Sequence, residues 1–170
     1  MPRILSIANQ KGGVGKTTTS VNLAASLAAY KQRVLLVDID PQGNATMGAG
    51  IDKHRCKTSI YHVLTEKAQI EDAIVTCEKG RFQLLPANGD LVAAEVELMQ
   101  EIGRETRLRH ALKRVAANYD YVIIDCPPSL NMLTVNALVA SDGVIIPMQC
   151  EYYALEGLSA LNNTIKQIAK

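Results

Sequence analysis

Short apolar runs recur along the chain, and each is followed by a turn and a segment whose apolar residues have helical spacing. Most of these runs are continuously apolar and do not alternate with polar residues, which is typical of strands covered on both faces. We expect strands at residues 4–8, 34–37, 82–85, 121–124 and 144–147. The pattern therefore predicts a mostly parallel sheet between layers of helices.

The segments between these runs carry apolar residues three or four positions apart, as amphipathic helices do. We expect helices at residues 17–30, 58–65, 91–100, 104–118, 132–140 and 154–169. Strands that alternate with helices predict a doubly wound α/β domain, with helices on both faces of a mostly parallel sheet. The chain shows no internal repeat, low-complexity stretch or linker that would divide it.

Length and composition agree with one folded domain. A chain of 170 residues, 48% of them apolar, buries a core of its own, which excludes an intrinsically disordered chain. The charges nearly cancel, at 18 Lys and Arg against 17 Asp and Glu, so bulk positive charge is excluded as a means of coating nucleic acid. Because the sequence contains neither a membrane span nor a signal-peptide pattern, we expect a cytoplasmic protein.

A glycine-rich stretch lies between the first expected strand and the first expected helix. Its backbone N–H groups can converge on phosphate oxygens, and the helix N-terminus adds partial positive charge. In this motif Lys16 reaches the phosphates and the Thr17 hydroxyl holds Mg²⁺. The alternative is a glycine-rich turn with an incidental lysine, which leaves Gly-Lys-Thr at a helix start unexplained. We expect the nucleotide to be bound by Lys11, Gly12, Gly13, Val14, Gly15, Lys16, Thr17 and Thr18.

Two carboxylates, Asp38 and Asp40, follow the second expected strand. Residues two positions apart on an extended chain point the same way, here at the carboxyl end of the sheet, where ligands bind in α/β folds. We expect Asp40 to orient an attacking water and Asp38 to support Mg²⁺ through a water. The alternative is turn chemistry, since the Asp-Pro and Gly-Asn pairs in this stretch favour turns.

A third carboxylate, Asp125, ends the apolar run at residues 121–124. A carboxylate at the tip of an apolar strand is the Walker B arrangement, which binds Mg²⁺ directly or through water. The alternative is a buried aspartate that caps the next helix, and both roles are compatible. The expected metal-binding residues are therefore Thr17, Asp38 and Asp125.

The glycine-rich loop departs from the pattern GxxxxGK[ST], because Gln10 stands where that pattern has glycine. The loop matches KGGxGK[ST] instead, with Lys11 near its start. This variant resembles the deviant Walker A ATPases, which include the ParA/Soj partition proteins and the MinD proteins. The resemblance implies that Lys11 reaches across a nucleotide-sandwiched dimer to the phosphates of the other protomer. The catalytic residues implied are Lys11, Lys16 and Asp40.

Three further strings resemble the ParA/Soj chromosome- and plasmid-partition ATPases: DIDPQGNAT at 38–46, DYVIIDCPPS at 120–129 and VIIPMQCEYYALEGL at 144–158. The resemblance implies an ATPase that uses ATP and Mg²⁺, dimerises when ATP is bound and binds DNA without sequence preference. It also implies a ParB/Spo0J-type partner, association with the nucleoid in the ATP-bound state, and no membrane partner. Family members continue further, so we expect residues 1–170 to be a single P-loop domain truncated at its C-terminus.

Two alternatives remain open: a MinD-like membrane-cycling ATPase that places the division site, and a nucleotide-binding module without activity of its own. Arg104, Arg107 and Arg114 lie near one helical face and are interpreted as a solvated surface. The four cysteines form no CxxC pair, so we expect reduced thiols that pack as small apolar groups.

Overall fold

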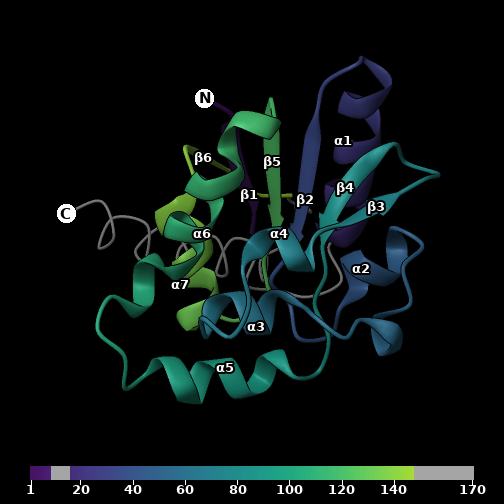
Figure 1. Cartoon of the computed structure of the whole chain (residues 1–170). Helices are drawn as coiled ribbons and strands as arrows, with labels where there is room; N and C mark the ends of the chain where they lie inside the picture. The colour runs from purple at the N-terminus through teal and green to yellow at the C-terminus, as the bar shows by residue number, and fades with distance from the viewer. Residues whose placement is uncertain (9–15, 148–170) are drawn as a thin grey trace, which may run out of the picture.

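The computed structural model describes residues 1–8 and 16–147, with side chains for all of these except residues 16–18. Within this part, one sheet has the strand order β3-β4-β2-β5-β1-β6 (Figure 1). Its strands are β1 (Arg3–Ile7), β2 (Val34–Asp38), β3 (Val75–Cys77), β4 (Phe82–Leu85), β5 (Tyr121–Asp125) and β6 (Gly143–Ile145). Only the β3–β4 pair is antiparallel among these strands. The predicted mostly parallel α/β sheet is confirmed.

The helices follow the expected order along the chain. They are α1 (Lys16–Ala29), α2 (Asn44–Gly48), α3 (Ile60–Leu64), α4 (Ile70–Ala73), α5 (Leu91–Leu98), α6 (Arg107–Val115) and α7 (Met132–Ala140). Short 3₁₀ turns at Arg104–Thr106 and Ala116–Asn118 extend α6 at both ends, so the prediction of one helix over 104–118 is nearly met; a third 3₁₀ turn lies at Lys53–Arg55. The helix expected at 154–169 lies outside the described residues.

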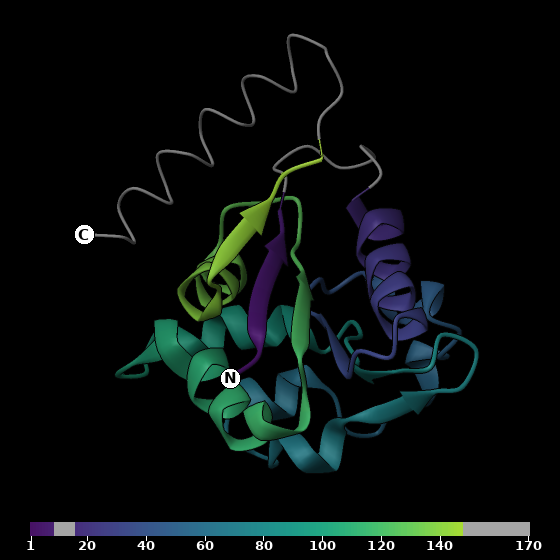
Figure 2. The ribbon, with the colours of Figure 1, turned by 90° about the horizontal axis from the view of Figure 1, so that it is seen from above.

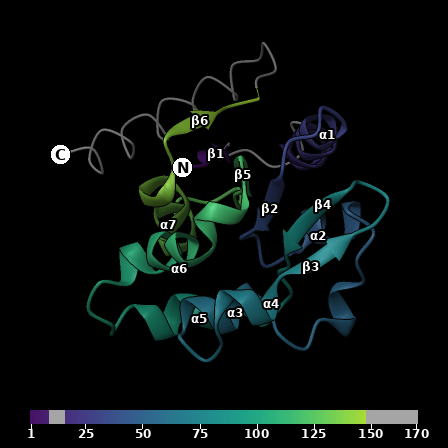
Figure 3. The ribbon, with the colours of Figure 1, turned by 45° about the horizontal axis from the view of Figure 1, so that its top comes forward.

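Helices cover both faces of the sheet, with α1 on one side and α3 to α7 on the other (Figures 2 and 3). All five residues of β2 are buried. Val34 and Leu36 belong to the apolar cluster that contains α1 residues. Leu35 and Val37 belong to the cluster on the opposite face. Because each face of β2 meets a separate apolar layer, the strand is continuously apolar, as the sequence pattern indicated.

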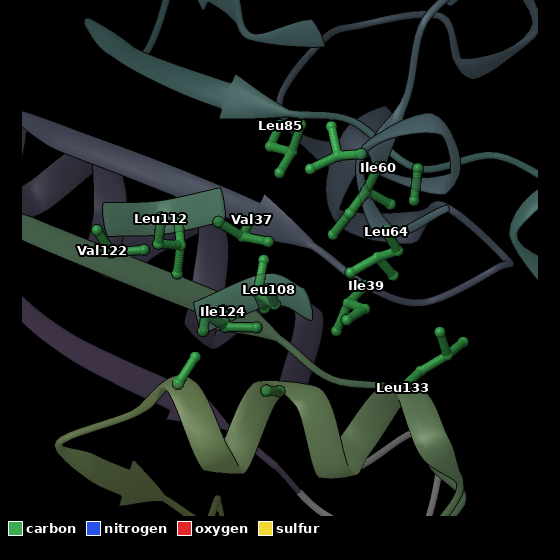
Figure 4. Close-up of a cluster of buried hydrophobic side chains, with 14 of the residues drawn as sticks. Val37, Ile39, Ile60, Leu64, Leu85, Leu108, Leu112, Val122, Ile124 and Leu133 are labelled. Atoms are coloured by element: carbon green, nitrogen blue, oxygen red, sulfur yellow. The ribbon is translucent and has the colours of Figure 1, made fainter. Parts of the chain in front are cut away.

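The larger core lies between the sheet and helices that include α3, α6 and α7 (Figure 4). Strand residues Val37 and Ile124 face Leu64, Leu108 and Leu112 from the helices in this view. Each of these five residues is at most 2% exposed. Truncating one of these leucines to alanine typically costs about 2–5 kcal/mol. This core fixes the position of the strand ends that carry the site.

One strand and two α-helices were not predicted: β3, α2 and α4. Each has three to five residues, too few for a hydrophobic period to be recognised. Strand β3 pairs antiparallel with β4 at the sheet edge, and Arg81 turns the chain between them with a φ of 59°. In the part of the chain that the structure describes, no helix is long and apolar enough to cross a membrane.

Candidate functional site

Three carboxylates gather at the carboxyl end of the sheet. Asp38 ends β2 and Asp125 ends β5, and the two residues are direct partners in the parallel register. Asp40 follows two residues after Asp38. Their exposed fractions are 0% for Asp38, 4% for Asp40 and 0% for Asp125. The expectation that these three residues lie at this edge of the sheet is confirmed, while their chemical roles stay predictions.

The Asp38 carboxylate holds the chain that follows β2. Its Oδ1 accepts a hydrogen bond from Asp40 N at 3.1 Å, and its Oδ2 accepts from Thr46 N at 2.8 Å and Thr46 Oγ1 at 2.7 Å. Burial, together with the nearby Asp125 charge, raises the pKa of Asp38 to about 7, against the three hydrogen bonds that lower it. A carboxylate in this setting is stabilised by a nearby cation.

The turn predicted from the Asp-Pro and Gly-Asn pairs is present alongside the carboxylates. Gly43 N donates to Asp40 O at 2.8 Å, and Gln42 N donates to Asp40 Oδ1 at 3.0 Å. Gly43 itself has a φ of 65°, and a Cβ at this position would lie 2.9 Å from Ala87 O and 2.8 Å from Lys53 Cδ. Glycine is therefore required here for both its backbone conformation and its size.

Thr46 stands in the sequence only as the last residue of a motif, and the structure gives it a specific contact. Its Oγ1 donates to Asp38 and accepts from Ala87 N at 3.0 Å. Thr46 is fully buried, so this hydroxyl joins the carboxylate loop to the segment between β4 and α5. No sequence pattern pairs residues 46 and 87, because their contact depends on how two loops meet.

Asp125 is tied to the first helix. Its Oδ1 accepts a hydrogen bond of 2.6 Å from Ser20 Oγ, and both residues are fully buried. Ser20 lies in the second turn of α1, which begins at Lys16. This contact sets the strand end of β5 against the start of the helix that follows the glycine-rich loop. Sequence reasoning missed Ser20, since it follows a run of threonines with nothing to distinguish it.

The phosphate-binding stretch itself lies largely outside the described residues. Residues 9–15 and the side chains of Lys16, Thr17 and Thr18 are not described, so the roles expected for Lys11, Gly12, Gly13, Val14 and Gly15 are untested. The backbone of α1 starts at Lys16, which agrees with a helix expected to begin at residue 17. Strand β1 therefore precedes the stretch and helix α1 follows it, as a P-loop requires.

The chemistry of the site fits Mg²⁺. Among the described residues, no group of three or more His, Cys, Asp and Glu side chains forms a metal centre. Two buried carboxylates opposite each other supply oxygen, the donor that Mg²⁺ prefers, and Mg²⁺ in such sites completes its shell with phosphate, hydroxyl and water oxygens. Asp38 and Asp125 thus fit an ion that is held jointly with a nucleotide.

Arg104, Arg107 and Arg114 contact neighbouring acids or backbone. Arg107 pairs with Glu66 at 2.8 Å and with Glu101 at 3.4 Å. Arg114 pairs with Glu71 at 2.9 Å, and Arg104 donates to a backbone carbonyl. Arg104 and Arg114 are exposed, as expected for a solvated surface. The interpretation is wrong for Arg107, because its side chain is only 12% exposed between its two glutamate partners. Cys56, Cys77 and Cys126 are free thiols, as expected.

Comparison with known proteins shows the family to which this chain is related. A family model described as an AAA domain matches residues 2–170. The chain is 57% identical over 170 residues to the sporulation initiation inhibitor protein Soj of Bacillus subtilis, covering 100% of this chain and 67% of Soj. The chain belongs to the ParA/Soj family. A second relative of the family, the chromosome partitioning protein ParA of Myxococcus xanthus, is 58% identical over 163 residues, which are 96% of this chain and 58% of that protein.

A solved structure related to the ParA/Soj chain is described as cobyrinic acid a,c-diamide synthase from Mycobacterium smegmatis with bound ATP analog and magnesium. It superposes with a TM-score of 0.95 at 44% identity, over 99% of this chain and 68% of the other. A Pseudomonas putida relative is 65% identical over 169 residues, which are 99% of this chain and 64% of that protein. The ParA/Soj chain therefore spans 58% to 68% of the length of these four proteins.

Proposed function

We propose that this chain is the nucleotide-binding portion of a Mg²⁺-dependent ATPase of the ParA/Soj type that acts in chromosome or plasmid partitioning. One observation carries the proposal: Asp38 and Asp125 lie opposite each other, buried, at the carboxyl end of a parallel sheet beside the first turns of α1. Ligands of α/β folds bind at this edge. The 57% identity to Soj supports the partition role.

In this proposal the residues divide the work of phosphoryl transfer. Lys16 binds the phosphates, and the loop over residues 12–18 surrounds them with backbone N–H groups. When bound, Mg²⁺ neutralises charge that develops on the phosphate oxygens. Thr17 and Asp125 would hold the ion, and Asp38 would support it through a water.

The remaining catalytic roles fall to Asp40 and Lys11. The Asp40 carboxylate accepts a hydrogen bond from the attacking water and orients it toward the terminal phosphate. Lys11 of one protomer stabilises charge on the phosphates of the other, so full activity needs a dimer. A cation supplied by a second protein chain is a known source of large rate effects in phosphoryl transfer.

The proposed cycle links ATP to DNA. The ATP-bound homodimer binds DNA without sequence preference and lies on the nucleoid, and a centromere-binding partner of the ParB/Spo0J type stimulates hydrolysis and releases it to the cytoplasm. In this proposal the main DNA-binding residues lie outside residues 1–170. Support comes from the names of relatives at 57% and 58% identity, Soj and chromosome partitioning protein ParA.

Size-exclusion chromatography with ATP and Mg²⁺ tests the dimer. The wild-type chain should elute as a dimer only with ATP. Lys11→Ala should bind nucleotide but stay monomeric, whereas Lys79→Ala, a change at an exposed hairpin residue, should behave as wild type. Dimerisation of Lys11→Ala at the wild-type level would show that Lys11 has no role across the interface.

A second candidate follows from the name of the Mycobacterium smegmatis structure, a diamide synthase with bound ATP analog and a TM-score of 0.95 to this chain. The two functions differ in what stimulates ADP formation. A partition ATPase responds to DNA with its partner protein, and such a synthase responds to cobyrinic acid with an amide donor.

A liposome pelleting assay with ATP distinguishes the MinD-like alternative from a partition ATPase. A partition ATPase stays in the supernatant, whereas a membrane-cycling ATPase pellets with the liposomes.

A further inference from the structure

Helix α5 and the turn that follows it present a row of apolar side chains to solvent. Val92, Val96, Met99 and Ile102 follow one another at intervals of four, three and three residues, and form what we name the α5 stripe. Their exposed fractions are 58%, 67%, 64% and 97%. The opposite side of the helix is fully buried through Leu91, Ala94 and Leu98.

The stripe lies at the margin of the molecule. Helix α5 forms the outer edge below α3 in Figure 1, and the same outer position is seen in Figure 3. Among the described residues, seven large apolar side chains are exposed, and the α5 stripe contains four of them. Scattered exposed apolar residues are ordinary, but a helical row of them marks an interaction surface.

The segment that carries the stripe is acidic. Between residues 90 and 105 there is one basic residue, Arg104, against five acidic ones: Asp90, Glu95, Glu97, Glu101 and Glu105. Arg104 is engaged with the backbone, donating to Met99 O at 2.9 Å. Lys67 and Arg107 pair with Glu97 and Glu101 at 3.4 Å each. Asp90, Glu95 and Glu105 have no such ion pair among the described residues.

A hollow of about 340 Å³ adjoins the C-terminal end of α5. Its lining includes Glu97 and Glu101, and also their ion-pair partners Lys67 and Arg107, so its charges balance. The acidic residues of the segment without such an ion pair, Asp90, Glu95 and Glu105, lie outside this lining.

We propose that the α5 stripe is the docking surface for a basic amphipathic helix of a partner protein. The apolar side of such a helix would cover Val96 and Met99, while its lysines and arginines would face the acidic residues around them. The charge of the segment argues against two other occupants. A second copy of α5 would bring like charges together, and an anionic lipid surface would be repelled.

This surface is close in the chain to the carboxylate loop. The segment that leads into α5 contains Ala87, whose N–H donates to Thr46 Oγ1, and Thr46 in turn donates to Asp38. A helix docked on α5 (Leu91–Leu98) thus contacts the element that follows the segment hydrogen-bonded to Thr46. The docking proposal goes beyond the proposed ATPase, and binding is expected without nucleotide.

The probe for the test is a fluorescein-labelled peptide of about 18 residues, long enough to form a helix, with leucine on one face and lysine on the other. Fluorescence anisotropy should show binding to this chain without nucleotide, and a matched leucine–glutamate peptide should not bind. The double variant Val96→Ser with Met99→Ser should weaken binding at least about tenfold. Glu95→Gln with Glu105→Gln should weaken it about threefold and reduce its salt dependence.

Control variants change exposed residues elsewhere: Tyr30→Ser just after α1 and Glu78→Gln in the β3–β4 turn. Both should bind the basic peptide as wild type does, and all variants should unfold at the same urea concentration. Failure of the basic peptide to bind, or equal binding to Val96→Ser with Met99→Ser, overturns the proposal. Self-association, or co-sedimentation with phosphatidylcholine vesicles, that this double variant abolishes would assign the stripe to a second copy or to lipid and would overturn it as well.

Discussion

The hydroxyl of Thr46 donates a hydrogen bond of 2.7 Å to Oδ2 of Asp38, and both side chains are fully buried. The same hydroxyl accepts from Ala87 N at 3.0 Å. One oxygen atom therefore connects the end of β2, the start of α2 and the segment before α5. The geometry of the carboxylate loop depends on this atom.

Replacing Thr46 with valine keeps the shape of the side chain and removes the hydroxyl. Ala87 N then loses its acceptor and Asp38 loses a donor, so the free energy of unfolding should fall by about 1–3 kcal/mol. Thr46→Ser keeps the hydroxyl, and its free energy of unfolding should fall by about 1 kcal/mol, for the lost methyl. Urea denaturation measures both; equal losses in the two variants would mean that the hydroxyl contributes nothing.

At Gly43, the effect of a close contact on stability can be measured separately from the effect of backbone strain. Gly43→Ala introduces a Cβ 2.9 Å from Ala87 O at a φ of 65°, and should lower the free energy of unfolding by about 2–4 kcal/mol. Gly50→Ala has a φ of 86° but no atom within 4 Å, so it should show strain alone, about 1 kcal/mol. Gly89→Ala, which meets nothing within 4 Å at an ordinary φ, is the control. If Gly43→Ala and Gly50→Ala are equally destabilised, the contact with Ala87 is unimportant.

Asp38 should make stability depend on pH in the absence of nucleotide and Mg²⁺. The pKa of Asp38 rises from 3.8 to about 7 in the folded chain, so between these values the folded state binds more protons than the unfolded state. The free energy of unfolding should therefore fall as pH rises through this window. Asp38→Asn should remove that contribution.

The measurement is urea denaturation of wild type and Asp38→Asn from about pH 3 to about pH 8, a range that brackets the expected titration. Asp125 interacts with Asp38 electrostatically, so the difference between the two pH profiles reports Asp38 together with its coupling to Asp125. Parallel profiles would show that Asp38 is not protonated near neutral pH.

Ser20 should affect both the stability of the fold and the binding of the metal. Ser20→Ala removes the 2.6 Å hydrogen bond to Asp125 Oδ1, and a hydrogen bond to a charged group contributes about 1.5–3 kcal/mol. Without this hydrogen bond to position Asp125, we expect the Mg²⁺ concentration needed for ATP binding to rise about tenfold, in the range seen when residues behind metal ligands are changed. Titration of Mg²⁺ with a fluorescent ATP analogue measures this. An unchanged titration would show that the Ser20 hydrogen bond does not position Asp125 for metal binding.

Much of the fold was predictable because its strands are buried on both faces. Residues 34–37 and 121–124 form runs without a charged residue, and their pattern identifies central strands of a parallel sheet. The predicted helix at 132–140 matches α7 (Met132–Ala140) at both ends. By contrast, the three residues of β3 owe their conformation to pairing with β4, which local sequence does not encode.

The site was predictable only where a side chain ends a strand. Asp38, Asp40 and Asp125 follow long apolar runs, and strand ends meet at one edge of a parallel sheet. Ser20 and Thr46 were not predicted, because each contacts its carboxylate from a different element. Their partners are set by how α1 and α2 pack, and this packing is not visible in residue spacing.

We propose that this chain hydrolyses ATP through the loop at Lys16 and the carboxylate of Asp40. The direct measurement is phosphate release from ATP, with and without Mg²⁺, by the wild-type chain, Lys16→Ala, Asp40→Ala and the exposed control Lys79→Ala. We expect slow Mg²⁺-dependent release by wild type and Lys79→Ala, and release at the enzyme-free level by Lys16→Ala and Asp40→Ala. Equal release by wild type and Lys16→Ala would contradict the claim.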